Sequence, residues 1–194
     1  MSKIILASKS PRRAEILSNL GVVFTAEPSD VDETVMDGIL PCDAVVEISR
    51  RKALFALSQH PERDVFVISA DTVVTFGKDI LGKPKDKNDA VRILTLLSGK
   101  THTVCTGFTL CTKETCVSEC VSTKVTFREL SEKEILHYVE SGEPMDKAGA
   151  YGIQGKGAVF VEGIEGDYFN VVGLPVCRLV SAAKSTFGID IAGF

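Results

Sequence analysis

Residues 3–13 read KIILASKSPRR, an apolar strand followed by a short turn and the beginning of a helix. Ser10 takes the position before the helix and Pro11 its first position, which are places that these residue types favour. The first turn of a helix carries partial positive charge and is normally stabilised by acidic side chains. This turn carries Arg12 and Arg13 instead, so the stretch predicts a strand-to-helix unit with an unusual concentration of positive charge.

Two interpretations of this basic turn are open. The free N–H groups of a helix start, the hydroxyls of Ser8 and Ser10, and three cations after a strand together describe a polyphosphate site. The same cations, Lys9, Arg12 and Arg13, are equally compatible with a turn whose side chains are simply solvated. The spacing of these residues does not separate the two interpretations.

The composition limits the class of protein. With 194 residues, 44% of them hydrophobic and 25% charged, the chain is long enough for one globular domain or two small lobes. A net charge of −4 argues against a general nucleic-acid binder. No apolar run approaches the ~18 residues of a membrane span, and the N-terminal run is too short for a signal peptide. We therefore expect a cytoplasmic protein that binds neither nucleic acid nor membrane.

The six cysteines are predicted to be free and reduced. None forms a CxxC pair, and no histidine lies beside them at the spacing of a zinc site. Four of them fall in segments of alternating Val, Thr and Phe, so they are expected to pack as small core residues in a reducing compartment. Zinc binding is the alternative. The six are Cys42, Cys105, Cys111, Cys116, Cys120 and Cys177.

Outward from the opening stretch, apolar strands and periodic helices alternate along the chain. A near-continuous apolar run at residues 65–68 predicts a strand covered on both faces. Ser131 and Glu134 form a capping box and predict the start of a helix. Helices interleaved with antiparallel strand pairs predict an α/β fold with a mixed, partly antiparallel twisted sheet flanked by helices. Helices are expected at residues 14–20, 43–58, 88–97, 133–140 and 174–187, and further strands at 22–24, 73–76, 80–81, 103–112, 117–127 and 159–161.

Asp71 is the sharpest candidate for chemistry. A carboxylate between two apolar strand segments either pairs with a cation or has a functional use, because burial of an unpaired charge is unfavourable. Its neighbours in sequence offer no cation nearer than Lys78, so a partner must come from elsewhere in the fold. A structural salt bridge and a catalytic or metal-binding acid both fit these observations.

Each of three further charged residues has both a structural and a functional interpretation. Lys52 lies in a predicted helix, where it is either a surface residue or part of a site. Lys83 stands between a glycine and a proline, which gives either a rigidly presented cation or a plain turn. Glu33 belongs to an acidic stretch, residues 27–37, that is either solvated or helps to hold a cation.

Together these residues supply what metal-assisted phosphoryl chemistry requires. Cations must contact the phosphate oxygens, carboxylates must hold a hydrated metal ion, and a base must activate water. The acids Glu33 and Asp71 with the cations Arg13, Lys52 and Lys83 match these requirements by residue type. The sequence alone does not place them together.

The sequence contains no motif typical of several other common enzyme classes. His60, His102 and His137 are scattered, with no Ser–His–Asp or HExxH pattern, and His102 is predicted to be a turn residue. A Walker A motif and a GxGxxG after a strand are both missing from the sequence, which excludes the usual ATPase and dinucleotide sites. The glycine-rich residues 149–157 predict tight bends or a close approach of the backbone, which by itself is weak evidence for phosphate binding.

Six motifs in order resemble the Maf family of nucleoside triphosphate pyrophosphatases. The resemblance extends from residue 3 to about residue 180, and six motifs in the right order are far more specific than any one of them. The motifs are Ser8-Lys9-Ser10-Pro11-Arg12-Arg13, Ala70-Asp71-Thr72-Val73-Val74, Gly82-Lys83-Pro84, Ser98-Gly99-Lys100-Thr101-His102, the run from Asp146 to Gly155, and Gly173-Leu174-Pro175.

The resemblance implies hydrolysis of a nucleoside triphosphate to the monophosphate and pyrophosphate with a divalent metal cation, Mg²⁺, Mn²⁺ or Co²⁺. It assigns Asp71 as the general base, and Glu33 and Asp71 as metal ligands. It assigns the binding of substrate phosphates to Ser8, Arg13, Lys52 and Lys83.

The same resemblance implies the substrate. Arg12, Thr72 and Gln154 fall on the positions that separate the branches of the family, and these residues look like the branch that acts on dTTP and UTP. The alternatives are the branch that hydrolyses 7-methyl-GTP, and a non-catalytic nucleotide-binding regulator of cell division, because the family is also linked to septum formation.

The resemblance further implies a single Maf-like domain over residues 1–194. Its two lobes would surround a central cleft, as in the similar inosine triphosphate pyrophosphatases. A homodimer is possible.

Overall fold

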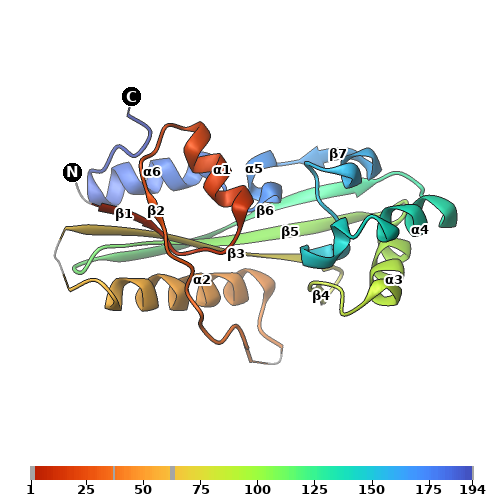
Figure 1. Ribbon diagram of the computed structural model, residues 1–194, viewed down its shortest axis with the longest axis horizontal. Coiled ribbons are helices and arrows are strands. Elements are labelled where there is room, and N and C mark those ends of the chain that lie inside the picture. Colours follow the sequence, from red (N-terminus) through yellow and green to blue (C-terminus); the bar gives the residue numbers. More distant parts are fainter. Residues whose placement is uncertain (1–2, 37, 62–63, 194) are drawn as a thin grey trace. The chain divides into compact units, whose positions relative to one another are not determined.

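A computed structural model describes residues 3–36, 38–61 and 64–193 (Figure 1). Asp37, the last residue of the predicted acidic stretch, therefore lies outside the described residues. The chain divides into two compact units. The first unit consists of Met1–Asp71, Thr106–Val121 and Gly173–Phe194, and the second of Thr72–Cys105 and Ser122–Val172.

The strands form one mixed sheet, in the order β2-β1-β3-β5-β6-β7, with β4 paired to β3. β1 is parallel to both β2 and β3, whereas β4 and β7 are antiparallel to their neighbours. The predicted α/β class with a mixed sheet is confirmed. The strands are β1 (Lys3–Leu6), β2 (Thr25–Ala26), β3 (Val65–Phe76), β4 (Asp79–Leu81), β5 (Thr101–Cys111), β6 (Cys116–Phe127) and β7 (Val161–Glu165).

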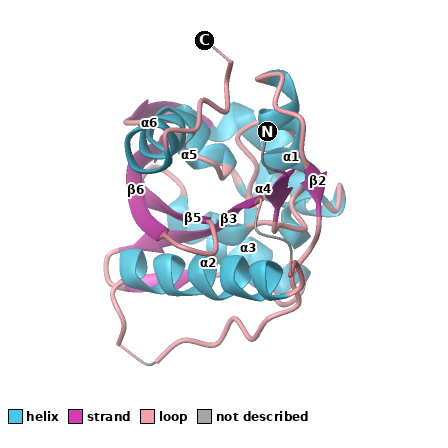
Figure 2. Ribbon diagram, turned by 90° about the vertical axis from the view of Figure 1, so that its left-hand side faces the viewer, coloured by secondary structure: helices cyan, strands magenta, loops and turns pink. Residues whose placement is uncertain are grey.

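In the first unit, helices cover both faces of the strands. Figure 2 shows α2 (Pro41–Ser58) on one face and α1 (Pro11–Asn19) and α6 (Val176–Phe187) on the other. Ile5 and Leu6 of β1 and residues 65–70 of β3 are buried in unbroken runs, as expected of strands covered on both sides. The core beneath α2 contains Ile5, Ala7, Ala53, Ala56, Val65, Val67 and Cys111.

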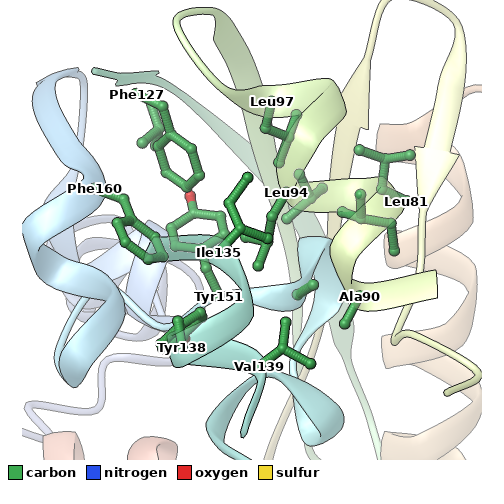
Figure 3. Packing of buried hydrophobic residues seen from close by; sticks show 14 of the residues in the cluster. Leu81, Ala90, Leu94, Leu97, Phe127, Ile135, Tyr138, Val139, Tyr151 and Phe160 are labelled. Carbon is green, nitrogen blue, oxygen red and sulfur yellow. The ribbon is translucent and has the colours of Figure 1, made fainter. Parts of the chain in front are cut away.

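The second unit packs its helices around an aromatic core. α3 (Lys87–Leu97) begins at Asp86, whose side chain accepts a hydrogen bond from the Asp89 N–H, and α4 (Glu132–Glu140) begins at the predicted capping box. Figure 3 shows leucines of α3 and residues of α4 directed toward a common interior with Phe127, Tyr151 and Phe160. The remaining elements are α5 (Tyr168–Val172) and the 3₁₀ turns η1 (Glu143–Asp146), η2 (Ala148–Ala150) and η3 (Lys156–Phe160).

Three local predictions differ from the structure. Residues 22–24 are not a strand, and the strand predicted at 159–161 begins only at Val161, because the preceding residues form η3. Helix α5 was not predicted. His102 is not a turn residue: it lies in β5, is 2% exposed, and pairs with the Tyr151 hydroxyl at 2.8 Å. For His102, the contact with Tyr151, 49 residues away, overrides the local pattern.

The prediction that every cysteine is free is wrong. Cys42 forms a disulfide with Cys120, and Cys111 forms one with Cys116. The second pair joins the end of β5 to the start of the neighbouring β6, a cross-strand closeness that spacing without a CxxC motif does not reveal. Cys105 and Cys177 are free, as predicted.

Among the described residues, every helix is too short or too polar to cross a membrane.

Candidate active site

Three ionised side chains meet in the first unit. The ammonium of Lys52 donates to Asp71 Oδ1 at 2.8 Å and lies 2.7 Å from Glu33 Oε1. The Lys52 side chain is 10% exposed and that of Asp71 15%, whereas Glu33 is 58% exposed. Lys52 is therefore not an exposed surface residue. It is the cationic partner that the partly buried carboxylate of Asp71 requires.

Polar contacts between α2 and the strands fix the position of this helix, which carries Lys52. The Ser49 hydroxyl lies 2.8 Å from the Thr109 hydroxyl of β5, and the Ser69 hydroxyl of β3 donates to the Ser49 carbonyl at 2.6 Å. At Gly107 the backbone of α2 approaches so closely that an added Cβ would lie 2.5 Å from the carbonyl carbon of Val45. α2 is therefore held directly on the strands, with Lys52 above the point where β3 presents Asp71.

Arg13 is buried and donates hydrogen bonds to oxygen atoms of its own unit. Its Nη1 donates to the Ala70 carbonyl at 2.7 Å and to the Ser8 hydroxyl at 3.0 Å, and its Nε donates to the Gly173 carbonyl at 2.7 Å. Burial lowers the pKa of Arg13 to about 10, and the nearby Asp71 carboxylate opposes this shift. Arg13 thus remains protonated at neutral pH and ties the opening turn to the residue directly before Asp71.

This geometry bears on both interpretations of the basic turn. Backbone carbonyls bind the guanidinium of Arg13, so its charge has partners within the protein, and the binding of phosphate by Arg13 stays a prediction. The first turn of α1 does lack acids, and Pro11 is at its start as predicted. Ser10 makes no side-chain cap: its N–H donates to the Ser8 hydroxyl at 3.2 Å. Arg12 is half-buried beside this turn.

The other three candidates lie in the second unit. Thr72 follows Asp71 on β3 and is half-buried, while Lys83 and Gln154 are exposed. The segments that carry Lys83 and Gln154 meet where the Gly149 N–H donates to the Gly82 carbonyl at 3.1 Å. The structure thus brings together Ser8, Arg13, Glu33, Lys52 and Asp71 in the first unit, and joins the segments of Lys83 and Gln154 in the second.

The two carboxylates suit a divalent metal ion. Because Glu33 and Asp71 contact one nitrogen atom, their oxygens lie close together, and in this structure the Lys52 ammonium holds the position between them. Magnesium prefers oxygen ligands and is usually held by one or two carboxylates together with water and substrate phosphates. The donor set therefore fits such an ion.

Sequence reasoning missed the role of Gly173. Its carbonyl accepts the Nε–H of Arg13, and its φ of 120° lies in the region that favours glycine. The Gly173-Leu174-Pro175 motif marked this position in the sequence. Its function could not be inferred from side-chain types, because the group that binds Arg13 is a backbone carbonyl.

Comparison with known proteins finds matches to one family over nearly the whole chain. The family model described as Maf-like protein matches residues 3–186. Proteins named dTTP/UTP pyrophosphatase are similar over nearly the whole chain. The protein from Bacillus cytotoxicus is 50% identical over 184 residues, which is 95% of each chain. The protein from Bacillus anthracis is 50% identical over 191 residues, 98% of each chain.

Solved structures match more distantly. A HAM1 protein from Coxiella burnetii has a TM-score of 0.49 and 17% identity, and the match covers 82% of this chain and 91% of that one. The Ham1 protein of Staphylococcus aureus has a TM-score of 0.45 and 12% identity, covering 67% and 72% of the two chains.

Proposed function

Because the chain belongs to the Maf-like protein family, we propose that it hydrolyses dTTP and UTP to the monophosphate and pyrophosphate. The name shared by relatives of about half identity supports this substrate class. The observation that carries the proposal is the contact of Lys52 on α2 with both Asp71 on β3 and Glu33 in the loop before α2. It supplies a base, a second carboxylate and a cation within one hydrogen-bonded group, as phosphoryl chemistry requires.

In the proposed mechanism Asp71 is the general base. Lys52 engages Oδ1 of Asp71 and so fixes the orientation of the carboxylate. Among the described residues no hydrogen-bond donor contacts Oδ2, which leaves this oxygen to accept a proton from the attacking water. Removal of that proton as the water approaches the α-phosphorus raises its nucleophilicity.

Cations and the metal site contact the triphosphate. Ser8, Arg13, Lys52 and Lys83 are the residues proposed to bind the phosphate oxygens, with Arg13, Lys52 and Lys83 supplying the positive charge. Glu33 and Asp71 would hold the divalent cation, Mg²⁺, Mn²⁺ or Co²⁺, which when bound supplies neutralisation of phosphate charge.

Specificity is proposed to come from Arg12, Thr72 and Gln154. An amide side chain offers both a donor and an acceptor, which suits the edge of a uracil or thymine base. Nucleoside triphosphates form a cytoplasmic pool, so we also propose a cytoplasmic location.

A substrate panel tests this function. We expect pyrophosphate release with added Mg²⁺ or Mn²⁺, and a higher kcat/KM for dTTP and UTP than for 7-methyl-GTP. Asp71→Asn keeps the shape of the side chain but removes the base, so it should lower kcat by about a hundred-fold or more. Asp79→Asn, the same substitution at an exposed position of β4, is the matched control.

Two results contradict the proposal. Binding of dTTP without release of pyrophosphate would instead indicate a regulator, and wild-type turnover by the Asp71→Asn variant would remove Asp71 as the base.

A further inference from the structure

The carboxylate of Glu143 lies at the centre of the glycine-rich loop in the second unit. Its Oε2 accepts the Lys156 N–H at 2.9 Å, and its Oε1 accepts the Gly157 N–H at 3.3 Å and the Tyr138 hydroxyl at 3.0 Å. The same Tyr138 oxygen accepts the Gly152 N–H at 3.2 Å. One carboxylate and one phenol therefore bind the backbone on both sides of Gln154.

The glycines of the loop are explained by this contact. A Cβ on Gly155 would lie 2.4 Å from Glu143 Oε1, and one on Gly157 would lie 2.8 Å from the Tyr138 hydroxyl. The predicted close approach of the backbone is thus confirmed, and the group approached is a side chain of the protein. Because Glu143 already accepts the Lys156 and Gly157 N–H groups, these are not available as a phosphate cradle.

The supporting side chains are themselves fixed. The Tyr138 ring packs edge-on against Phe160, with ring centroids 4.9 Å apart, and both belong to the aromatic core (Figure 3). Lys147 donates to the Glu143 carbonyl at 2.7 Å. Glu143 is therefore anchored from its backbone and from its carboxylate, and it joins the rigid core to a loop whose residue Gln154 is exposed.

We propose that Glu143 is a positioning residue for substrate specificity: by binding the backbone on the C-terminal side of Gln154, it holds that amide in the orientation that recognises the base. Tyr138 holds the N-terminal side through Gly152. This inference rests on the proposed function, which assigns Gln154 to the pyrimidine.

The first measurement follows the loop itself. Hydrogen exchange should be faster at the amides of Lys156 and Gly157 in Glu143→Ala and, to a smaller extent, in Glu143→Gln, whose amide nitrogen cannot accept an N–H bond. Glu140→Gln removes the same charge from α4, where Glu140 contacts exposed Lys87, and should leave these amides protected. Unchanged hydrogen exchange at these two amides in Glu143→Ala would contradict the proposal that Glu143 fixes the loop.

The second measurement is a double-mutant cycle on kcat/KM for dTTP. Displacing a recognition group by a fraction of an ångström to 1 Å should lower kcat/KM by about ten- to hundred-fold in Glu143→Ala, mainly through KM. Selectivity for dTTP over dCTP should fall in parallel. Because both residues act on one contact, adding Glu143→Ala to Gln154→Ala should have little further effect.

The outcomes separate the two proposals. Independent, multiplicative losses in the cycle would mean that Glu143 acts only on stability, and would overturn the positioning role while the enzyme remains a pyrophosphatase. If Gln154→Ala alone left dTTP turnover and selectivity unchanged, the assignment of Gln154 under the proposed function would be wrong, and the positioning role would fall with it. If the wild-type protein hydrolysed no triphosphate, the proposed function itself would be wrong.

Discussion

Among the described residues of the first unit, Arg13 and Lys52 are buried cations, and their contacts include different kinds of acceptor. Backbone carbonyls bind Arg13, and these acceptors are fixed by the chain. Carboxylates bind Lys52, and the side chain of one of them, Glu33, is mostly exposed. Under the proposed function, Lys52 is therefore the cation that would transfer from carboxylate to phosphate, while the carbonyl contacts of Arg13 hold the opening turn.

At the level of single residues, the burial of His102 also leads us to expect that the stability of the protein depends on pH. Burial lowers its pKa to about 4, below the ~6.5 of an exposed histidine. In this window the unfolded chain binds more protons than the folded one, so the free energy of unfolding falls as the pH drops from about 6.5 toward 4. At pH 5 the loss attributable to His102 should be about 2 kcal/mol relative to pH 7.5.

Urea titrations at the two pH values measure this difference. His102→Gln does not titrate and can still bind the Tyr151 hydroxyl, so it should lose about 2 kcal/mol less than the wild type on acidification. The exposed His137, changed to Gln, is the control and should behave like the wild type. Equal losses in all three proteins would show that His102 is not kept neutral by the fold.

Among the elements, α2 links the fold to the chemistry. It carries Lys52, and its position depends on the absence of a side chain at Gly107 of β5. The atoms that a Cβ would meet there belong to the backbone of Val45 and Val46, which cannot yield without a movement of the helix. The distance between α2 and the strands therefore sets the distance from Lys52 to Asp71.

Gly107→Ala should accordingly disturb both stability and activity. Overpacking at this contact should lower the free energy of unfolding by about 1–3 kcal/mol, and displacement of Lys52 should lower kcat/KM by about ten- to hundred-fold. Gly163→Ala in β7 is the matched control, because nothing lies within 4 Å of its added Cβ. Denaturation and steady-state kinetics on both variants check this, and full activity in a folded Gly107→Ala protein would contradict the role of α2.

The elements also show what local sequence can predict. Pro11, the capping box at Ser131 and the apolar run of β3 depend on neighbours within a few residues, and each prediction there is confirmed. The partner of Asp71 is 19 residues away and that of Arg13 is 160 residues away. Residue types predicted candidates for the site, but these pairings exist only after the sheet has formed.

At the scale of the whole molecule, the division into two units falls within continuous strands. β3, β5 and β6 each contribute residues to both units, and the chain passes from the first to the second directly after Asp71. The candidate residues divide along the same line. Most of those proposed to act on phosphate and water belong to the first unit, and Thr72, Lys83 and Gln154 belong to the second. The folding of both units is therefore coupled through shared strands.

The Cys42–Cys120 disulfide acts at this scale, because it closes a loop of 78 residues that includes part of both units. By restricting the unfolded chain, a loop of this length should stabilise the fold by about 4 kcal/mol. The C42S/C120S double variant should lose about this much in urea titrations without reductant, whereas C177S, which changes an exposed free cysteine, should lose little. Reductant should then lower the stability of the wild type far more than that of the double variant, whose remaining Cys111–Cys116 pair closes a loop of only 5 residues. Equal stability of the two variants in both conditions would mean that the long-range pair does not form in solution.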